Sequence, residues 1–265
     1  MMSNAQVVLV TGGTGVLGRE VVARLARAGY PVRPMSRGPA RRQLDAANVE
    51  WAQADLLTGA GLAEAVTGVG TIVHAASNPF QQTKQVDVEG TGRLLEQARA
   101  AGVSHLVYIS IVGIDRVPLN YYRHKLAAEK VIEQAGVPYS ILRTTQFHNL
   151  IDSLLGRFTR LPLVTFLDGA MQFQPIDEGE VAAMLVERVA AGPQGRLPDV
   201  GGPQVRRLAD LVRPWLKARH LRRLILPGYL PGGFGAAVRQ GLNTAPQNKS
   251  GRITWEKWLQ RRYSS

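Results

Sequence analysis

The 265-residue sequence contains no cysteine. Disulfide bonds, thiolate metal sites, iron–sulfur clusters and a cysteine nucleophile are therefore all excluded. A chain without cysteine is compatible with a reducing compartment, and we expect a cytoplasmic protein. The five histidines are dispersed and lack the spacing of metal ligands, so we assign no metal site.

Long hydrophobic runs are also missing. No apolar run approaches the roughly 18 residues that a transmembrane helix requires. The first six residues carry no basic segment, and the apolar run at residues 7–10 is too short for the core of a secretory signal. At 45% hydrophobic and 20% charged residues, the composition is that of an ordinary globular chain. We therefore expect one enlarged domain, or a domain with an appendage, and no membrane span.

Acidic residues are nearly absent from the last quarter of the chain. Residues 1–200 carry 19 basic and 18 acidic side chains, whereas residues 201–265 carry 13 basic and two acidic ones. Such a segment suits an anionic substrate, a membrane surface or a phosphate backbone. Its charges are interleaved with proline and glycine, however, and no helix-turn-helix or zinc-finger pattern accompanies them. We expect a solvated basic face and no specific binding of nucleic acid.

Short β-branched runs alternate with longer helical patterns over the first 142 residues. The predicted strands are residues 6–10, 32–36, 49–54, 71–75, 106–110 and 139–142. The clearest predicted helices are residues 15–28, 83–101 and 121–135. Strands that alternate with helices form right-handed βαβ units around a parallel sheet. We therefore predict the α/β class, with a doubly wound parallel sheet of the Rossmann type.

The regular alternation ends after residue 142. Further helices are predicted at residues 146–158, 181–191 and 208–218, with glycine-rich and proline-rich stretches between and after them. We expect residues 1–150 to form the α/β domain and residues 151–265 to form a smaller, irregular extension. This extension is expected to pack at the carboxyl edge of the sheet, where open α/β folds bind ligands, and to bind substrate there.

A glycine-rich segment follows the first predicted strand directly. The run Thr11–Gly18 satisfies both Gly-x-Gly-x-x-Gly and Gly-x-x-Gly-x-x-Gly, and a helical pattern follows it. One glycine permits a tight turn, one lets the backbone approach a pyrophosphate, and the last allows close helix–strand packing. The helix N-terminus directs its amides at the phosphates. The segment predicts a dinucleotide site formed by Gly12, Thr14, Gly15, Val16, Leu17 and Gly18.

The charge after the second strand predicts which dinucleotide binds. A carboxylate there would accept hydrogen bonds from the ribose of NAD and repel the 2′-phosphate of NADP, which arginine attracts. No acidic residue occurs between Glu20 and Asp45, while Ser36 and Arg37 lie at the strand end. We therefore predict NADP as the cofactor, with NADPH preferred over NADH. Four other arginines of this interval are better explained as surface residues: Arg24, Arg27, Arg41 and Arg42.

Two more strand ends fit the same ligand. Asp55 and Leu56 follow the third strand, where a carboxylate can accept from the adenine amino group while leucine packs on the ring. An ordinary helix cap is the alternative for Asp55. The His74 ring is better explained by packing than by catalysis, but small residues beside it would let the ribose lie against the backbone. The fourth strand ends in His74, Ala75, Ala76 and Ser77.

A tyrosine and a lysine lie one helical turn apart. Tyr121 and Lys125 share one face of a predicted helix. A nearby ammonium stabilises a phenolate and so lowers a tyrosine pKa that is otherwise near 10, and the lysine can also hold the nicotinamide ribose. Ser110, at the end of the fifth strand, is placed to donate a hydrogen bond to a substrate carbonyl. Tyr122, three residues from Lys125, is an alternative to Tyr121.

These segments together resemble the short-chain dehydrogenases/reductases, and within them the atypical NmrA-like branch of NAD(P)-binding proteins. The resemblance implies that Ser110, Tyr121 and Lys125 form a catalytic Ser–Tyr–Lys set, and that Phe147 contacts the cofactor. Its specific motifs end near residue 150. It rests on residues 11–18, 55–56, 74–77, 107–110, 121–125 and 141–147.

We therefore expect an NADP(H)-dependent oxidoreductase that reduces a carbonyl or quinone-like small molecule, with tyrosine as the acid/base group. We expect it to act as a monomer or a homodimer. Two alternatives remain open: a regulatory protein that senses NADP without turning it over, and a sugar-nucleotide epimerase.

Overall fold

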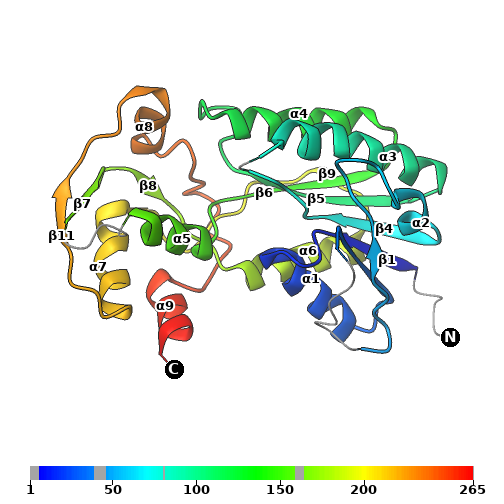
Figure 1. Cartoon of the computed structure of the whole chain (residues 1–265), viewed down its shortest axis with the longest axis horizontal. Coiled ribbons are helices and arrows are strands. Elements are labelled where there is room, and N and C mark those ends of the chain that lie inside the picture. The colour runs from blue at the N-terminus through cyan, green and yellow to red at the C-terminus, as the bar shows by residue number, and fades with distance from the viewer. Residues whose placement is uncertain (1–5, 39–45, 80, 159–163, 265) are drawn as a thin grey trace. The chain divides into compact units, whose positions relative to one another are not determined.

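The structure is a computed structural model of the whole chain, and it describes residues 6–38, 46–79, 81–158 and 164–264 (Figure 1). The chain divides into two compact units. Unit 1 consists of residues 1–110, 123–142 and 181–197, and unit 2 consists of residues 111–122, 143–180 and 198–265. The two units are therefore interleaved along the sequence, whereas the sequence-based expectation places a single boundary at residue 150.

Unit 1 is built on a seven-stranded sheet with the order β3-β2-β1-β4-β5-β6-β9. The pairs β3–β2, β2–β1, β1–β4, β4–β5 and β6–β9 run parallel. The strands are β1 (Val7–Thr11), β2 (Val32–Ser36), β3 (Ala52–Gln53), β4 (Val69–His74), β5 (His105–Ile111), β6 (Tyr139–Thr144) and β9 (Gly195–Arg196).

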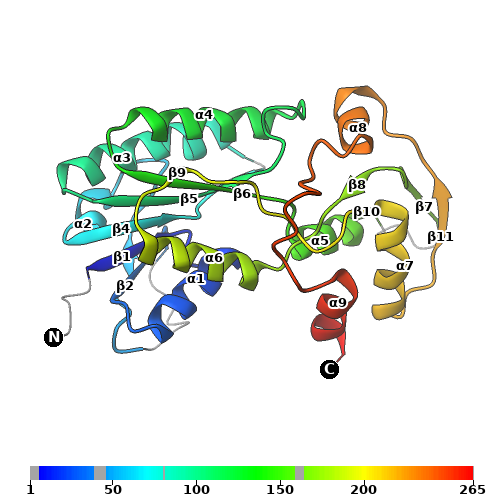
Figure 2. The same ribbon diagram turned by 180° about the vertical axis from the view of Figure 1, so that it is seen from behind.

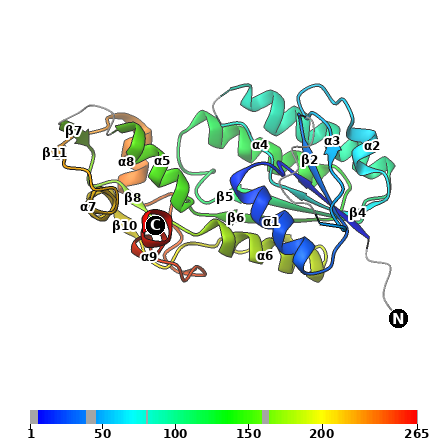
Figure 3. The same ribbon diagram turned by 60° about the horizontal axis from the view of Figure 1, so that its bottom comes forward.

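Helices cover both faces of this sheet. Figures 1 and 3 show α1 and α6 on one face and α2, α3 and α4 on the other. Figure 2 shows α6 running along the sheet on the same face as α1. The predicted α/β class and the doubly wound Rossmann-type sheet are confirmed. The helical segments are α1 (Val16–Arg27), α2 (Leu62–Val66), the π-helical turn η1 (Lys84–Glu89), α3 (Gly90–Ala100), α4 (Asn120–Gln134) and α6 (Glu178–Ala191).

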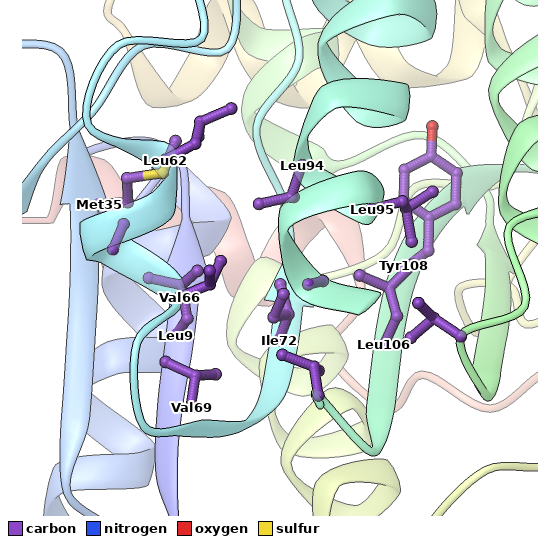
Figure 4. Close-up of a cluster of buried hydrophobic side chains, with 14 of the residues drawn as sticks. Leu9, Met35, Leu62, Val66, Val69, Ile72, Leu94, Leu95, Leu106 and Tyr108 are labelled. Atoms are coloured by element: carbon purple, nitrogen blue, oxygen red, sulfur yellow. The ribbon is translucent and has the colours of Figure 1, made fainter. Parts of the chain in front are cut away.

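The core of unit 1 lies between the sheet and its helices. Leu9, Ile72 and Leu106, from three adjacent strands, are all fully buried. Figure 4 shows these side chains beside Leu94 and Leu95 of α3. A strand that is covered on both faces has no polar side to present to water, which is why these strands read as continuous apolar runs rather than alternating ones.

The strand order indicates where a ligand would bind on the sheet. The chain passes from β1 to β2 and β3 on one side, then returns to β4 and continues on the other side. The carboxyl ends of β1 and β4 therefore flank the point at which the direction of winding reverses. In open α/β sheets the crevice at this point is where ligands bind.

In the described part of unit 2, short strands form two small sheets, and helices accompany them. The strands β8 (Gln172–Phe173) and β10 (Arg206–Arg207) pair antiparallel, and β7 (Val164–Leu167) and β11 (Leu224–Pro227) pair parallel. The helices are α5 (His148–Phe158), α7 (Leu208–Ala218), α8 (Gly232–Arg239) and α9 (Trp255–Tyr263).

Three tryptophans form much of the core of unit 2. The Trp255 and Trp258 rings stack with their centroids 5.4 Å apart, and Trp215 is fully buried. The Trp215 Nε1 atom donates to a carboxylate oxygen of Asp152 at 2.6 Å, and Trp255 Nε1 donates to the Leu211 carbonyl at 2.9 Å. Both buried indole donors are thus satisfied, as buried polar groups require.

The elements that the sequence did not predict are short. The four strands of unit 2 have two or four residues each, α2 has five residues and α8 has eight. Segments of this length show no clear hydrophobic period. The helix predicted at residues 83–101 is divided into η1 and α3. Among the described residues, no helix is long and apolar enough to cross a membrane.

Candidate functional site

The glycine-rich loop after β1 packs against the end of β4. Gly12 has a φ of +67°, and a Cβ atom added to it would lie 2.9 Å from the backbone N and Cα of Ala76. A Cβ added to Gly18 would lie only 2.1 Å from the Gly12 carbonyl oxygen. Glycine is required at both positions, at Gly12 for its conformation and close approach and at Gly18 for the packing of α1 against the loop.

The first turn of α1 contains no acidic side chain. Gly15 caps the helix with an extended backbone, and no side chain accepts a hydrogen bond from the capped amides. A Cβ added to Gly15 would meet only the Gly12 carbonyl oxygen, at 3.1 Å. Val16, the first helical residue, is 43% exposed. Free amides and the helix dipole at this end favour an anion such as a phosphate.

A cavity of about 330 Å³ lies at this loop, and every residue that lines it belongs to unit 1. Ten of the predicted cofactor residues line it: Gly12, Thr14, Gly15, Ser36, Arg37, Asp55, Leu56, Ala75, Ala76 and Ser77. Four lining residues were not predicted from the sequence: Met35, Ala54, Asn78 and Val86. The first two end apolar strand patterns and the last begins a helical one, so sequence pattern alone presents them as core residues.

The other predicted cofactor residues lie elsewhere. Leu17 and Gly18 are buried in α1 and do not line the cavity. Phe147 belongs to unit 2 and forms an isolated parallel bridge with Ile176. A role for Phe147 in binding the cofactor stays a prediction.

Arg37 differs from its neighbour Arg33. The Arg33 guanidinium donates to the carbonyls of Ala65 and Thr67 and pairs with Glu50 at 3.3 Å. Arg37 is exposed at the cavity, and its guanidinium makes no hydrogen bond or ion pair with any residue in the described part of the chain. Its main-chain carbonyl accepts from Gln53 at 3.3 Å. Arg37 is therefore available to an anionic ligand, whereas Arg33 is already occupied.

The carboxylate of Asp55, which follows β3, lines the cavity. One oxygen of Asp55 accepts from the Leu57 amide at 2.9 Å, which holds the local turn. The other oxygen can accept from a ligand. Asp55 thus both accepts a local backbone hydrogen bond and lines the cavity.

A buried histidine ties the end of β4 to β1. Thr11 Oγ1 accepts from the amides of Ala75 and Ala76, both at 3.1 Å, and lies 2.7 Å from Nδ1 of His74. The Thr11 hydroxyl therefore donates its proton to Nδ1 of His74, so the proton of the neutral ring is on Nε2. The Nε2 atom lies 2.9 Å from Thr91 Oγ1. Burial, and then the positive charge of Lys125, lower the pKa of His74 to about 3, so the ring is neutral.

A buried carboxylate on η1 holds the loop after β4. Asp87 is 1% exposed and accepts from the Ser77 hydroxyl at 2.5 Å and from the Asn78 amide at 3.0 Å. Both donors belong to residues that line the cavity. Asp87 was not predicted from the sequence. Its only signal is an acidic residue flanked by two valines in a helical pattern, which local sequence does not distinguish from a surface position.

Lys125 binds the main chain near the end of β5, next to Ser110. Lys125 is 2% exposed, and its Nζ atom donates to the Ile109 carbonyl at 3.0 Å. Burial lowers the pKa of Lys125 to about 8, and the negative charges of Asp87 and Glu129 oppose that effect. Ser110 is 1% exposed, and its hydroxyl has no hydrogen-bond partner among the residues that the structure describes.

The two tyrosines of α4 have different environments. Tyr121 is half-buried in the first turn of the helix, four residues before Lys125. The Tyr122 ring, with its centroid 6.1 Å from that of Tyr121, packs against the core of unit 2. Burial raises the pKa of Tyr122 to about 12. Tyr122 is thus a weaker acid than an ordinary tyrosine.

Residues 12–189 match the family described as NAD(P)H-binding. The (4-alkanoyl-5-oxo-2,5-dihydrofuran-3-yl)methyl phosphate reductase of Streptomyces griseus is 31% identical to the chain over 200 residues, which cover 74% of this chain and 68% of that protein. The divinyl chlorophyllide a 8-vinyl-reductase of Oryza sativa subsp. indica is 31% identical over 223 residues. That match covers 74% of this chain but only 54% of the plant protein.

A solved structure shares the fold over nearly the whole chain. The NADPH-dependent quinone oxidoreductase of Escherichia coli, complexed with NADPH, superposes with a TM-score of 0.80. The superposition covers 97% of this chain and 99% of that one, at 20% sequence identity. An identity this low shows the common fold alone.

Proposed function

The chain belongs to the NAD(P)H-binding family and is an NAD(P)-dependent oxidoreductase; we propose that it uses NADPH to reduce the carbonyl or quinone-like group of a small molecule. Family membership confirms the resemblance to the atypical short-chain dehydrogenases/reductases. Ser110, Tyr121 and Lys125 are the residues proposed to act on the substrate, and the cavity of unit 1 is proposed to hold the cofactor.

The observation that carries this proposal is the buried Ser110 hydroxyl, which has no hydrogen-bond partner among the described residues and lies one residue after the carbonyl that binds Lys125. The lysine ammonium is bonded to the carbonyl of the residue immediately before Ser110. A buried hydroxyl that lacks a partner costs free energy, on the order of 1–3 kcal/mol. A substrate oxygen that accepts from Ser110 Oγ would satisfy this group. A serine and an ammonium at the same strand end form a site for a polarised carbonyl.

The cavity suits the parts of a dinucleotide. The amides at the start of α1 would bind the pyrophosphate, and the Asp55 carboxylate would accept from the adenine amino group. Backbone at Ala75 and Ala76 would lie against a ribose, since neither residue carries a large side chain. The bound cofactor would supply the hydride, and the protein would supply its position and the proton.

Arg37 supports the preference for NADPH. Its guanidinium lies at the cavity without a partner in the described residues and can pair with a 2′-phosphate. The acidic residue that lines the cavity, Asp55, follows β3 rather than β2. Among the described residues, no carboxylate at the end of β2 would therefore oppose the phosphate.

Tyr121 is proposed as the proton donor. Reduction of a carbonyl forms a C–H bond with the hydride and an O–H bond with a proton, and the phenol would donate that proton to the oxygen. The Lys125 ammonium, one turn away, stabilises the phenolate that remains. Because the pKa of Lys125 is about 8, this ammonium is mostly present at neutral pH. Tyr122, with its pKa raised to about 12, is less suited to the role.

Oxidation of NADPH by the purified protein, measured across a panel of aldehydes, ketones, benzoquinones and naphthoquinones, tests the function. We expect turnover with at least one class, and we expect Ser110→Ala to lower kcat by about tenfold or more while the Kd for NADPH is unchanged. Thr145→Ala, which removes a buried hydroxyl of unit 2, controls for general destabilisation. Tight NADPH binding without turnover of any compound would instead favour a regulatory sensor.

A further inference from the structure

Unit 2 contains a cavity that shares no lining residue with the proposed cofactor cavity, and we propose that it binds one molecule of a single-chain amphiphile with an anionic head group. The cavity has a volume of about 640 Å³. Sites for small molecules typically measure roughly 300–1,000 Å³. All of its lining residues belong to unit 2, so the inference does not depend on the nucleotide site.

The walls come from four segments of unit 2, which are residues 167–170, 209–213 and 225–229 and the end of α8 at Arg239. Figure 2 shows the β7–β11 pair beside α7, and residues of all three elements line the cavity. Leu167 and Val212 are buried at 5% and 1% exposure and form its floor. Ile225 and Leu226 are half-buried, and Ala209 is exposed at the rim. These side chains present a largely aliphatic surface, which suits a hydrocarbon chain.

One cation of the lining is uncompensated. Asp168 is 7% exposed and forms a short ion pair with Arg239, whose guanidinium also donates to the Tyr229 hydroxyl at 3.0 Å. These two charges cancel. Arg213 lies exposed on α7, and no residue of the described chain bonds or pairs with its guanidinium. The lining therefore carries a net positive charge that an anionic head group would neutralise.

The surroundings strengthen this positive field. Beyond residue 200 the only acidic residues are Asp210 and Glu256, and Glu256 is paired with Arg206 at 3.1 Å. Arg222 and Arg223 directly precede β11. A cationic head group would be repelled here, whereas a phosphate or carboxylate would be attracted.

Exposed apolar side chains extend the aliphatic surface beyond the cavity. Leu224, Tyr229 and Leu230 are 59%, 71% and 41% exposed, and all three lie within seven residues of chain. Large exposed apolar side chains that gather beside a cavity are typical of a ligand-binding groove. The combination of an aliphatic cavity, an apolar rim and a free guanidinium matches a ligand that has a long hydrocarbon tail and one anionic end.

Titration calorimetry with dodecyl phosphate, kept below the concentration at which it forms micelles, tests the proposal. We expect one saturable site per chain, and binding of dodecanol, dodecyltrimethylammonium or inorganic phosphate that is at least about tenfold weaker. Arg213→Gln should weaken the binding of dodecyl phosphate by about tenfold. Arg222→Gln removes the same charge from an exposed position outside the cavity and should change the affinity by less than about twofold.

Ala209→Trp, which would fill the cavity from an exposed helical position, should abolish binding while thermal unfolding and NADPH affinity stay as in the wild type. Equal losses in the Arg213 and Arg222 variants would overturn the proposal in favour of a diffuse basic surface. Retained binding in Ala209→Trp would exclude the cavity as the site. Binding to vesicles of phosphatidylglycerol and phosphatidylcholine, without binding of monomeric dodecyl phosphate, would assign the surface to a membrane instead.

Discussion

The Nζ atom of Lys125 lies 4.1 Å from the centroid of the Tyr108 ring, over its face. The negative face of an aromatic ring attracts a cation, which offsets part of the cost of burying the ammonium. The same ring stacks with His74 at a centroid distance of 5.3 Å. His74 in turn is bonded to Thr11, at the start of the glycine-rich loop. One packed group of side chains therefore connects the loop to the lysine.

Asp87 should set the upper pH limit of activity. Its negative charge opposes the lowering of the Lys125 pKa, which is about 8. Asp87→Asn keeps an oxygen that can accept from Ser77 but removes the charge, so the pKa of Lys125 should fall further. Since the ammonium is present only below this pKa, the alkaline decline of kcat/KM should move to lower pH. The pH profile measures this, with Glu96→Gln on α3 as a control. An unshifted profile would exclude the electrostatic role.

Tyr121→Phe should eliminate turnover while the Kd for NADPH stays nearly intact. The phenol donates the proton in the proposed reaction but is not needed for the cofactor to bind. Lys125→Ala should weaken cofactor binding and turnover together, because the ammonium is proposed to serve both. Steady-state kinetics and fluorescence titration separate the two effects. Tyr122→Phe is the matched control, and loss of activity in it alone would move the proton donor by one residue.

Arg37→Ala should weaken NADPH binding by about tenfold or more and leave NADH binding nearly unchanged. A charge-assisted hydrogen bond to a phosphate contributes roughly 1.5–3 kcal/mol, and NADH lacks that phosphate. Fluorescence titration with both cofactors gives the ratio of affinities. Arg27→Ala removes an exposed arginine that does not line the cavity and should have no effect. Equal affinities in the wild-type protein would contradict the predicted preference.

Gly15→Val and Gly18→Val should fail for different reasons. A Cβ atom at Gly15 would meet only the Gly12 carbonyl oxygen, at 3.1 Å, so the variant should fold after a small local shift but exclude the pyrophosphate. A side chain at Gly18 would collide with the Gly12 carbonyl, so this variant should lose stability as well. Thermal unfolding and NADPH titration distinguish the two. Gly92→Ala, whose added carbon would meet only Val131 at 3.8 Å, should keep both properties.

Buried histidines should make the protein sensitive to acid. Burial lowers the pKa of His105 to about 4 from 6.5. Below pH 6.5 His105 is therefore protonated in the unfolded chain, whereas in the native state it stays neutral down to about pH 4. The free energy of unfolding consequently decreases as pH falls from 6.5 to about 4. The loss is roughly 1.4 kcal/mol per pH unit for one histidine. Urea unfolding of His105→Asn should show a smaller decline between pH 6.5 and 4.5, whereas the exposed His220→Asn should behave as the wild type.

Much of unit 1 could be predicted because its signals are local. The glycine spacing after β1 predicts a turn that only glycine can adopt, and the alternation of strands with helices predicts a parallel sheet. Arg37 could be selected by its place at the end of β2 and by the absence of nearby acidic residues. Each of these inferences depends on neighbours within a few residues or on a regular period.

The sequence by itself thus determined the α/β class, the position of the nucleotide loop and ten of the residues that line the cavity. Only the tertiary structure decided that Asp87 holds the loop after β4, that Arg33 pairs with Glu50 while no described residue pairs with Arg37, and that unit 2 contains an aliphatic cavity of its own. Thr11 and His74 are 63 positions apart, and Asp168 and Arg239 are 71 apart. Contacts at such separations depend on how the whole chain packs, and neither periodicity nor local spacing encodes them.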